Sequence, residues 1–257
     1  MRRGLGAGRS ATRPRGVPGS ERRCSGNRCS VPCVPRRLNT LEEGPKWTEH
    51  WMILDALRMA YLVTNVGFRQ QQACELIGTT CLTCLVSPTH LYVACTGDSR
   101  AVLRRGGRTV PLSCDQKPTR GDEADRVKSC GGRIYMTDGF RVEGILGMTR
   151  AIGDVALEKC GVSPEPEFTV LQRMEDDEVI VMATDGLWEV MTNEAATATA
   201  CKVLARVQEK GHSRNAGCRH AAKVLAHHAF KSGSSDNITV TVIDLKGDDF
   251  RWDQLGG

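Results

Sequence analysis

Four acidic residues stand where predicted strands or turns end, so the fold could bring them together at one edge. Asp98 follows an apolar strand in a Gly-Asp-Ser turn, and Asp185 comes directly after a second, strongly apolar strand. Asp236 precedes a strand of alternating apolar and polar residues, and Glu189 lies one helical turn beyond Asp185. Hard divalent cations such as Mg²⁺ and Mn²⁺ prefer carboxylate oxygens and water as ligands. These four acids are therefore the candidate metal ligands.

Each acid also has an ordinary structural interpretation. An aspartate in a Gly-Asp-Ser turn such as that of Asp98 often hydrogen-bonds only the backbone of its own turn. Asp185 could cap a short helix. The metal hypothesis is stronger for Asp185, because a carboxylate that leaves a buried strand is costly unless another charge compensates it.

The predicted elements that position these acids combine strands with intervening helices. Apolar residues at helical spacing predict a long amphipathic helix over about 49–70. Further helices are predicted over 122–130, 194–208 and 216–230, and strands over 79–86, 91–95, 101–105, 109–112, 178–184 and 238–245. No alternation of strand and helix with a Gly-rich phosphate loop is present. The order favours an α+β fold with antiparallel sheets over a doubly wound one.

Composition divides the 257 residues into three parts. Residues 1–46 are rich in Gly, Pro, Ser and Arg, which predicts a disordered basic segment. That segment could be an organelle transit peptide, a basic tail or a misassigned start of the reading frame. Residues 47–246 form the predicted domain, and residues 247–257 a loose tail. Because the arginines of the first segment supply the net charge of +5, the domain gives no indication of nucleic-acid binding.

Twelve cysteines are many, but no apolar signal region follows the basic start. We therefore expect free thiols in a reducing compartment, the cytoplasm or the nucleus. Cys24, Cys29 and Cys33 lack a fourth zinc ligand at matching spacing. Cys81 and Cys84 fall within a predicted strand and are interpreted as small buried side chains.

Two further features argue against other sites and other environments. Histidines 220, 227 and 228 lie on a predicted helix far from the acidic residues, so surface positions are expected. No run of residues approaches the roughly 18 apolar residues of a membrane span.

Taken in chain order, the motifs of residues 47–246 resemble the PP2C (PPM) family of metal-dependent protein serine/threonine phosphatases. The resemblance implies two antiparallel sheets packed face to face, with helices on both outer faces. The part of the chain that resembles the family lacks the family's N-terminal segment. The motifs that carry it are Gly78-Thr79-Thr80, Gly97-Asp98-Ser99-Arg100-Ala101, Asp115-Gln116-Lys117-Pro118, Arg150-Ala151-Ile152-Gly153-Asp154, Pro164-Glu165-Pro166-Glu167, Asp185-Gly186-Leu187-Trp188-Glu189 and Ser235-Asp236-Asn237-Ile238-Thr239-Val240.

The resemblance also implies chemistry. Members of this family hydrolyse phosphoserine and phosphothreonine in proteins with a water that two Mn²⁺ or Mg²⁺ ions activate. By motif, Asp185 and Asp236 resemble ligands of the first metal, and Asp98 resembles a ligand of a weaker third metal that shares Asp185. Glu189 stands where an aspartate of that third site is often found. Residues 131–146 resemble the flap that shapes substrate access. Phosphoproteins are the implied substrates, and a monomer is expected.

One signature of the family is missing from the sequence. The Asp-Gly-His-Gly-Gly string, which in the family supplies the carboxylate that bridges the metals and the general-acid histidine, does not occur. No arginine resembles the one that binds the substrate phosphate. We therefore expect an incomplete fold, an unformed second metal site and impaired hydrolysis. The alternatives are a non-catalytic relative, a pseudophosphatase that acts as a binding or regulatory module, and a truncated or spliced product that folds poorly.

Overall fold

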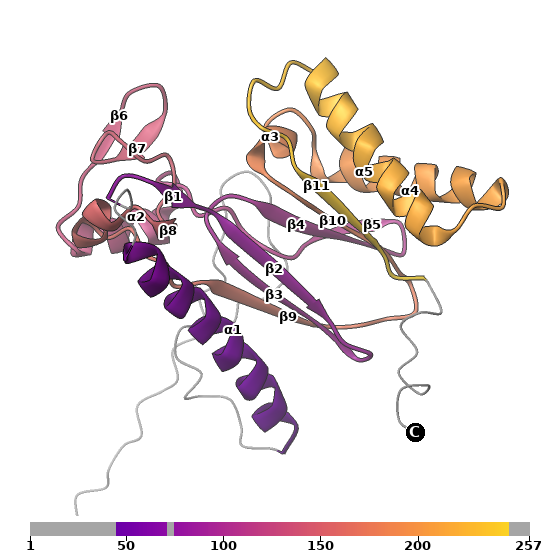
Figure 1. Cartoon of the computed structure of the whole chain (residues 1–257), viewed down its shortest axis with the longest axis horizontal. Coiled ribbons are helices and arrows are strands. Elements are labelled where there is room, and N and C mark those ends of the chain that lie inside the picture. The colour runs from indigo at the N-terminus through magenta and orange to yellow at the C-terminus, as the bar shows by residue number, and fades with distance from the viewer. Residues whose placement is uncertain (1–44, 71–74, 247–257) are drawn as a thin grey trace, which may run out of the picture.

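Two antiparallel β-sheets packed face to face form the centre of the molecule, which we analyse in a computed structural model that describes residues 45–70 and 75–246 (Figure 1). One sheet has the order β2–β3–β9, and the other has the order β11–β10–β4–β5. The three strands of the first sheet are β2 (Cys81–Val86), β3 (His90–Thr96) and β9 (Glu167–Gln172). The four strands of the second are β4 (Arg100–Arg105), β5 (Arg108–Pro111), β10 (Asp177–Ala183) and β11 (Val240–Asp244).

Alternation of side chains along the strands builds the layer between the sheets. Leu91 and Val93 of β3 point to the same side and pack with Leu103 and Ile180 of the second sheet, and all four are at most 1% exposed. The register pairs Ile180 of β10 with Leu103 of β4, so both strands present this layer at the same height. Because β10 is apolar on both faces, its other side is free to meet helices.

Helices cover both outer faces of the sandwich (Figure 1). α4 (Asn193–Glu209) and α5 (Arg214–Lys231) pack on one another and on the four-stranded sheet. Their N-termini are capped by the hydroxyls of Thr192 and Ser213, which accept hydrogen bonds from backbone amides. α1 (Pro45–Arg69) covers the three-stranded sheet. The hydroxyl of its buried Tyr61 donates to the carbonyl oxygen of Ala94 at 2.8 Å and fastens the helix to β3.

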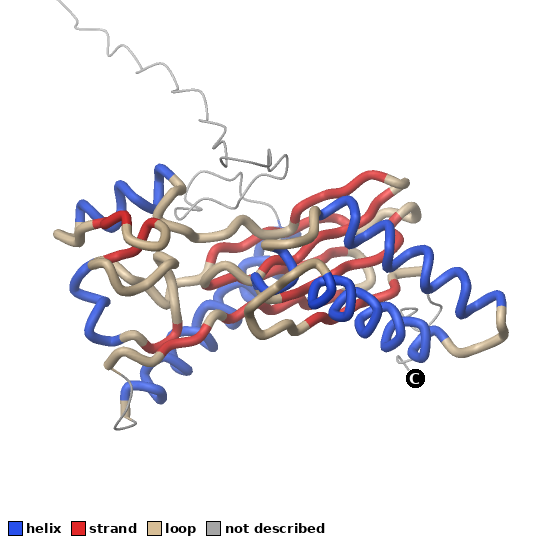
Figure 2. Tube along the Cα trace, turned by 90° about the horizontal axis from the view of Figure 1, so that it is seen from above, coloured by secondary structure: helices blue, strands red, loops and turns tan. Residues whose placement is uncertain are grey.

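A smaller part of the chain stands at one end of the sandwich (Figure 2). It packs its own apolar cluster around Val127, Val142 and Leu157. It contains α2 (Gly121–Ser129), the hairpin of β6 (Ile134–Met136) and β7 (Phe140–Val142), the 3₁₀ helix η1 (Val155–Cys160), and β8 (Ile152–Gly153) paired with β1 (Gly78–Thr79). The hairpin lies inside the predicted flap, residues 131–146.

The predicted α+β class and the packed antiparallel sheets are confirmed. Most element boundaries differ by one or two residues from the predictions. Strand 79–86 divides at Thr80, and the short strands β6, β7 and β8 and the longer β9 were not predicted. Histidines 220, 227 and 228 are exposed on α5, as expected.

The cysteine prediction was correct only in part. Seven described cysteines are free thiols, whereas Cys114 is disulfide-bonded. The CxxC cysteines Cys81 and Cys84 are strand residues, as predicted, but they are partly rather than fully buried. Cys24, Cys29 and Cys33, the predicted disordered segment up to residue 44 and the tail 247–257 lie outside the described residues.

Within the described residues, no helix combines the length and apolar character that a bilayer crossing requires.

Candidate metal-binding edge and pocket

Asp185 lies at the point where β10 ends and a short helix, α3 (Asp185–Trp188), begins. The buried Trp188 anchors this turn, because its indole Nε1 donates to the carbonyl oxygen of Ala183 at 3.0 Å. The guanidinium of Arg100 lies 5.3 Å from the centre of the Trp188 ring, within cation–π range. The apolar strand and the indole together fix the position of the Asp185 carboxylate at the sheet edge.

Asp236 lies in the loop before β11, and Thr184 ties this loop to the end of β10. The Thr184 hydroxyl donates to the carbonyl oxygen of Asn237 at 3.0 Å and accepts from the amide of Thr239 at 3.1 Å. The Thr184 amide donates to the carbonyl oxygen of Thr239 at 3.1 Å. A Cβ on Gly186 would lie 2.5 Å from the carbonyl oxygen of Asn237, so the two loops touch where only glycine fits.

Asp185 and Asp236 line one pocket of about 560 Å³. The pocket lies between the edge of the four-stranded sheet and the smaller part of the chain. Its lining residues are Gly78, Thr79, Thr80, Leu146, Met148, Asp154, Thr184, Asp185, Asp236 and Asn237. Carboxylates, three threonine hydroxyls and apolar walls therefore meet in one cavity.

The third carboxylate of the pocket, Asp154, was not among the predicted site residues. It is 6% exposed, and its backbone has a left-handed conformation with φ 46°. A Cβ on Gly78 would lie 2.0 Å from its Oδ2, so the carboxylate rests directly on that glycine. Among the residues that the structure describes, no donor forms a hydrogen bond with this carboxylate, and burial raises its pKa.

Asp98 is buried and does not line the pocket. Burial is the main reason that its pKa rises from 3.8 to about 6, and the charges of Asp185 and Asp115 add to the rise. Lys117 opposes it from 3.4 Å. Since the charge of Asp185 contributes to the raised pKa of Asp98, the two carboxylates lie near one another.

The residues around Asp98 brace its turn. The side-chain oxygen of Gln116 accepts from the amide of Gly97 at 2.7 Å, and its nitrogen donates to the carbonyl oxygen of Cys95 at 3.1 Å. Arg100 forms two hydrogen bonds with Asp115, at 2.9 and 2.7 Å. These contacts explain why the Gly97–Ala101 and Asp115–Pro118 motifs occur together in the chain.

Glu189 is exposed and is not among the lining residues of the pocket. Its amide donates to the carbonyl oxygen of Asp185, which continues the short helix. The structure thus brings Asp185 and Asp236 into one cavity and leaves both Asp98 and Glu189 outside its walls.

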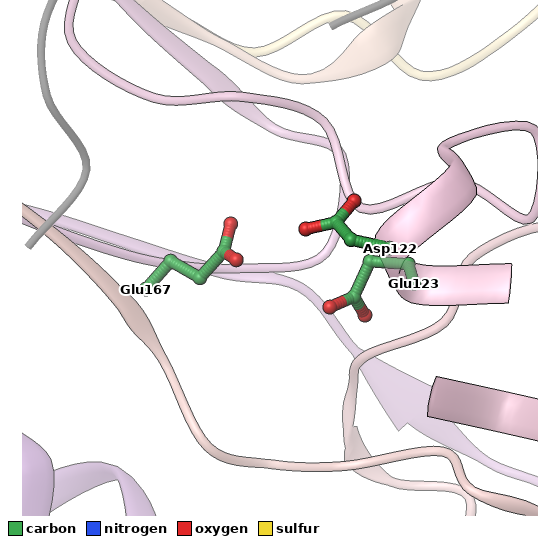
Figure 3. Close-up of side chains that lie close together, drawn as sticks. All are labelled: Asp122, Glu123 and Glu167. Carbon is green, nitrogen blue, oxygen red and sulfur yellow. The ribbon is translucent and has the colours of Figure 1, made fainter. Parts of the chain in front are cut away.

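A second acidic group, Asp122, Glu123 and Glu167, is close-packed enough to suggest a metal site (Figure 3). Arginines already occupy it. Arg120 forms ion pairs with all three carboxylates, and Arg150 bonds Glu123 at 2.6 Å and Glu167 at 3.1 Å.

The pKa of Glu123 also indicates that arginines, and not a metal ion, compensate this acidic group. Burial alone would raise its pKa, but hydrogen bonds from Arg150 and Arg126 outweigh burial and hold the pKa below its usual range. A network in which guanidinium donors satisfy every carboxylate has no need of a cation. We interpret it as a brace between α2 and β9.

Comparison with known proteins shows the family to which the chain belongs. The family model described as "Protein phosphatase 2C" matches residues 26–238, more than half of the chain. The chain belongs to the protein phosphatase 2C family.

Named relatives are similar to this chain in sequence over most of its length. "Protein phosphatase 2C 77" of Arabidopsis thaliana is 38% identical over 222 residues, which cover 80% of this chain and 51% of that protein. "Probable protein phosphatase 2C 68" of Oryza sativa subsp. japonica is 45% identical over 175 residues, which cover 68% of this chain and 47% of that protein. The chain spans about half the length of the curated relatives that it matches.

A solved structure shows the same fold. The "Crystal structure of serine-threonine phosphatase 2C from Toxoplasma gondii" superposes with a TM-score of 0.64 at 20% identity, covering 80% of this chain and 72% of that one. The family match begins at residue 26, whereas the resemblance was predicted to begin at residue 47. The predicted boundaries at residues 46 and 246 stay predictions.

Proposed function

We propose that this chain carries the Asp185–Asp236 side of the catalytic site of a metal-dependent protein serine/threonine phosphatase. The observation that carries the proposal is the joining of these two acids at one pocket through Thr184. The two acids come from opposite ends of neighbouring antiparallel strands, which places them side by side at the sheet edge.

The donors around this edge suit Mg²⁺ or Mn²⁺. Both ions prefer carboxylate and water oxygens, and Asp185 and Asp236 offer carboxylates that open into a pocket with room for water. Burial is the main cause of the raised pKa of Asp98, and the charge of Asp185 adds to the rise. A cation at Asp185 would relieve that part of it. In this proposal Asp185 and Asp236 hold one ion, and Asp98 supports a weaker site that shares Asp185.

A bound ion of this kind lowers the pKa of a coordinated water and polarises phosphoryl oxygens. The remaining pocket residues would position a phosphorylated side chain. The hydroxyl of Thr79 donates to the carbonyl oxygen of Thr80, and the hydroxyl of Thr80 pairs with that of Ser99. Both hydroxyls would have to leave these partners to donate to phosphate oxygens, while Leu146 and Met148 give the pocket apolar walls. Asp154 adds a negative charge that strengthens cation binding in the same cavity. The substrates would be phosphoserine and phosphothreonine proteins.

We further propose that hydrolysis by this chain is slow. Its 257 residues contain no Asp-Gly-His-Gly-Gly string and thus lack the family's bridging carboxylate and general-acid histidine. Groups that act as one catalytic unit lose orders of magnitude in rate together when one of them is removed. Under the alternative function, a pseudophosphatase, the edge binds metal or phosphoprotein without turnover, and the intact Asp185–Asp236 pair is compatible with that.

Calorimetric titration with Mn²⁺ tests metal binding separately from activity. The wild-type chain should bind Mn²⁺, and the Asp185→Asn variant should bind it at least tenfold more weakly. Asp125→Asn is the matched control, since Asp125 is an exposed acid on α2 that lies outside the pocket. Equal Mn²⁺ affinity in the Asp185→Asn variant would overturn the metal site.

A phosphothreonine peptide assay with Mn²⁺ then separates the enzyme from the pseudoenzyme. We expect turnover several orders of magnitude below that of a full-length relative, abolished in Asp185→Asn. Turnover that equals the relative's and is lost in Asp185→Asn would show that the missing motif is dispensable. Metal binding with no detectable turnover would favour the pseudophosphatase.

A further inference from the structure

The outward face of α1 carries an apolar stripe that packs against nothing in the described part of the chain. Its members are spaced alternately by four and three residues, the spacing of a two-helix seam. Met52, Met59, Val63 and Val66 are 69%, 46%, 60% and 56% exposed, and Ala56 between them is exposed as well. We call these five residues the α1 seam.

The α1 seam is not the face by which the helix joins the fold. Leu54 and Tyr61, each 4% exposed, lie with Phe68 on the opposite side of the helix, where Tyr61 and Phe68 pack toward the three-stranded sheet. Their spacing of seven residues marks a second stripe, half a turn away from the first. The helix therefore has two apolar faces, and among the described residues only one of them packs against the fold.

The other sheet shows what normally meets such a face. α4 and α5 lie side by side on the four-stranded sheet and bury Leu204 and Leu225 in one cluster (Figure 1). On the three-stranded sheet α1 has no helical neighbour within the described residues, and Leu85 of β2 is left 43% exposed beside it. Contiguous exposed apolar surface of this kind marks interaction sites.

We propose that the α1 seam pairs with the α1 seam of a second copy of this chain, in an antiparallel two-helix contact. The stripe is self-complementary. A two-fold axis at the level of residues 60–62 sets Met59 beside Val63 of the second copy, and Ala56 beside Val66 of the second copy. Each contact occurs twice, as a two-fold interface requires. The two Leu62 side chains meet at the axis.

Charges flanking the seam favour the same arrangement. In this register the exposed Asp55 lies opposite Arg69 of the second copy, whereas a parallel pair would place Asp55 opposite Ala60 and lose this ion pair. Arg69 also forms an ion pair with Glu158 of its own copy, so its guanidinium would be shared between two carboxylates. The small side chains of Ala56 and Ala60 allow the two helices to approach closely.

Sedimentation equilibrium on the intact chain tests the proposal. A dimer is expected at micromolar concentration. Val63→Asp should raise the dissociation constant at least tenfold, because it places charges in the middle of the seam. Thr64→Asp is the matched control on the same helix, because Thr64 is exposed but outside the seam. Circular dichroism checks that both variants keep the fold, which is expected because neither site is buried.

A cysteine at the axis tests the register. Oxidised Leu62→Cys should give a covalent dimer well above the level of the wild-type chain, whereas Asp55→Cys should not. A monomeric wild-type chain at 100 μM, the outcome expected from sequence, would overturn the proposal. So would a dimer that survives Val63→Asp. A dimer that Val63→Asp abolishes, but that cross-links through Asp55→Cys rather than Leu62→Cys, would overturn the antiparallel arrangement.

Discussion

Asp98, one of the proposed metal ligands, is a buried carboxylate whose charged form destabilises the fold. The pKa of Asp98 is about 6 in the folded chain, against 3.8 for an ordinary aspartate. Between these two pH values the folded chain therefore holds a proton on Asp98 that the unfolded chain releases. Stability is therefore fully present below pH 3.8 and falls as the pH rises through 6. Two pKa units correspond to about 3 kcal/mol at most.

The first prediction concerns Asp98→Asn. In EDTA at pH 7.5 the variant should be more stable than wild type by about 1 to 3 kcal/mol, because the buried charge is gone. Urea unfolding measures the difference. At pH 5 the difference should shrink, since wild-type Asp98 is then largely protonated. A variant that is less stable than wild type at pH 7.5 would contradict the cause that we assign to the raised pKa.

The arginine–carboxylate brace has the opposite pH dependence. The pKa of Glu123 lies below its usual range, so its contribution to stability is present above the unfolded pKa, about 4.3, and is lost as the pH falls below it. Acid should therefore loosen the contact between α2 and β9.

The second prediction is that Glu123→Gln lowers the free energy of unfolding by about 3 kcal/mol at pH 7, because it leaves Arg150 buried with less compensation. The stability of the variant should also depend less on pH between 5 and 3. Asp138→Asn, which removes an exposed ion pair with Arg141, is the control and should change neither quantity. Equal losses in the two variants would argue against the brace.

Individual residues were predictable from sequence when a strand signal stood beside them. Asp185 and Asp236 could be assigned to one edge because apolar strands border both. Asp154 could not, since its place in the pocket depends on the pairing of Gly78 with Gly153, a contact between distant segments. Glu189 was assigned by motif, and helical spacing alone could not show that its side chain would face solvent.

At the scale of elements, the close approach of α3 to the loop before β11 determines the site. Gly186 is the point of contact. The third prediction is that Gly186→Ala destabilises the fold by about 1 to 3 kcal/mol and weakens Mn²⁺ binding, because the new methyl group displaces the backbone of Asn237 and with it Asp236. Thermal unfolding and calorimetry measure the two effects.

Gly121→Ala is the matched control, since a Cβ there meets no atom within 4 Å. It should leave both stability and Mn²⁺ affinity close to wild type. If Gly186→Ala bound Mn²⁺ as well as this control, the contact at Gly186 would not position Asp236.

Long elements were predictable because their periodicity is local. β9 was not, because the prolines before it resemble a loop and its strand character appears only when it pairs with β3. The β6–β7 hairpin was expected only as part of a flap, since its strands have three residues each. Pairing between distant segments is a tertiary property that no local pattern carries.

For the whole molecule, family motifs predicted the layered sandwich correctly, and the sequence also showed which family motif is missing. The α1 seam was not foreseen, since the amphipathic pattern of 49–70 was interpreted as a single core-facing stripe. Two stripes on one helix can be separated only when the sheet contacts of Tyr61 are known.

The fourth prediction follows from pairing through the α1 seam. The melting temperature of the wild-type chain should rise with protein concentration, because association stabilises the folded state by mass action. The Val63→Asp variant should melt at a temperature independent of concentration. Differential scanning calorimetry at protein concentrations between about 5 and 200 μM measures these melting temperatures. A wild-type melting temperature that does not change with concentration would contradict pairing through the α1 seam.

The position of β11 at the margin of its sheet has a consequence for motion. Strands at a margin fray more easily than central ones, and the Thr184 bonds to Asn237 and Thr239 lie where this fraying would begin. Fraying would carry Asp236 away from Asp185 while β10 stays in place. A cation held by both acids would suppress this fraying of β11. The amide hydrogen of Thr239 would therefore exchange with solvent more slowly when the cation is bound.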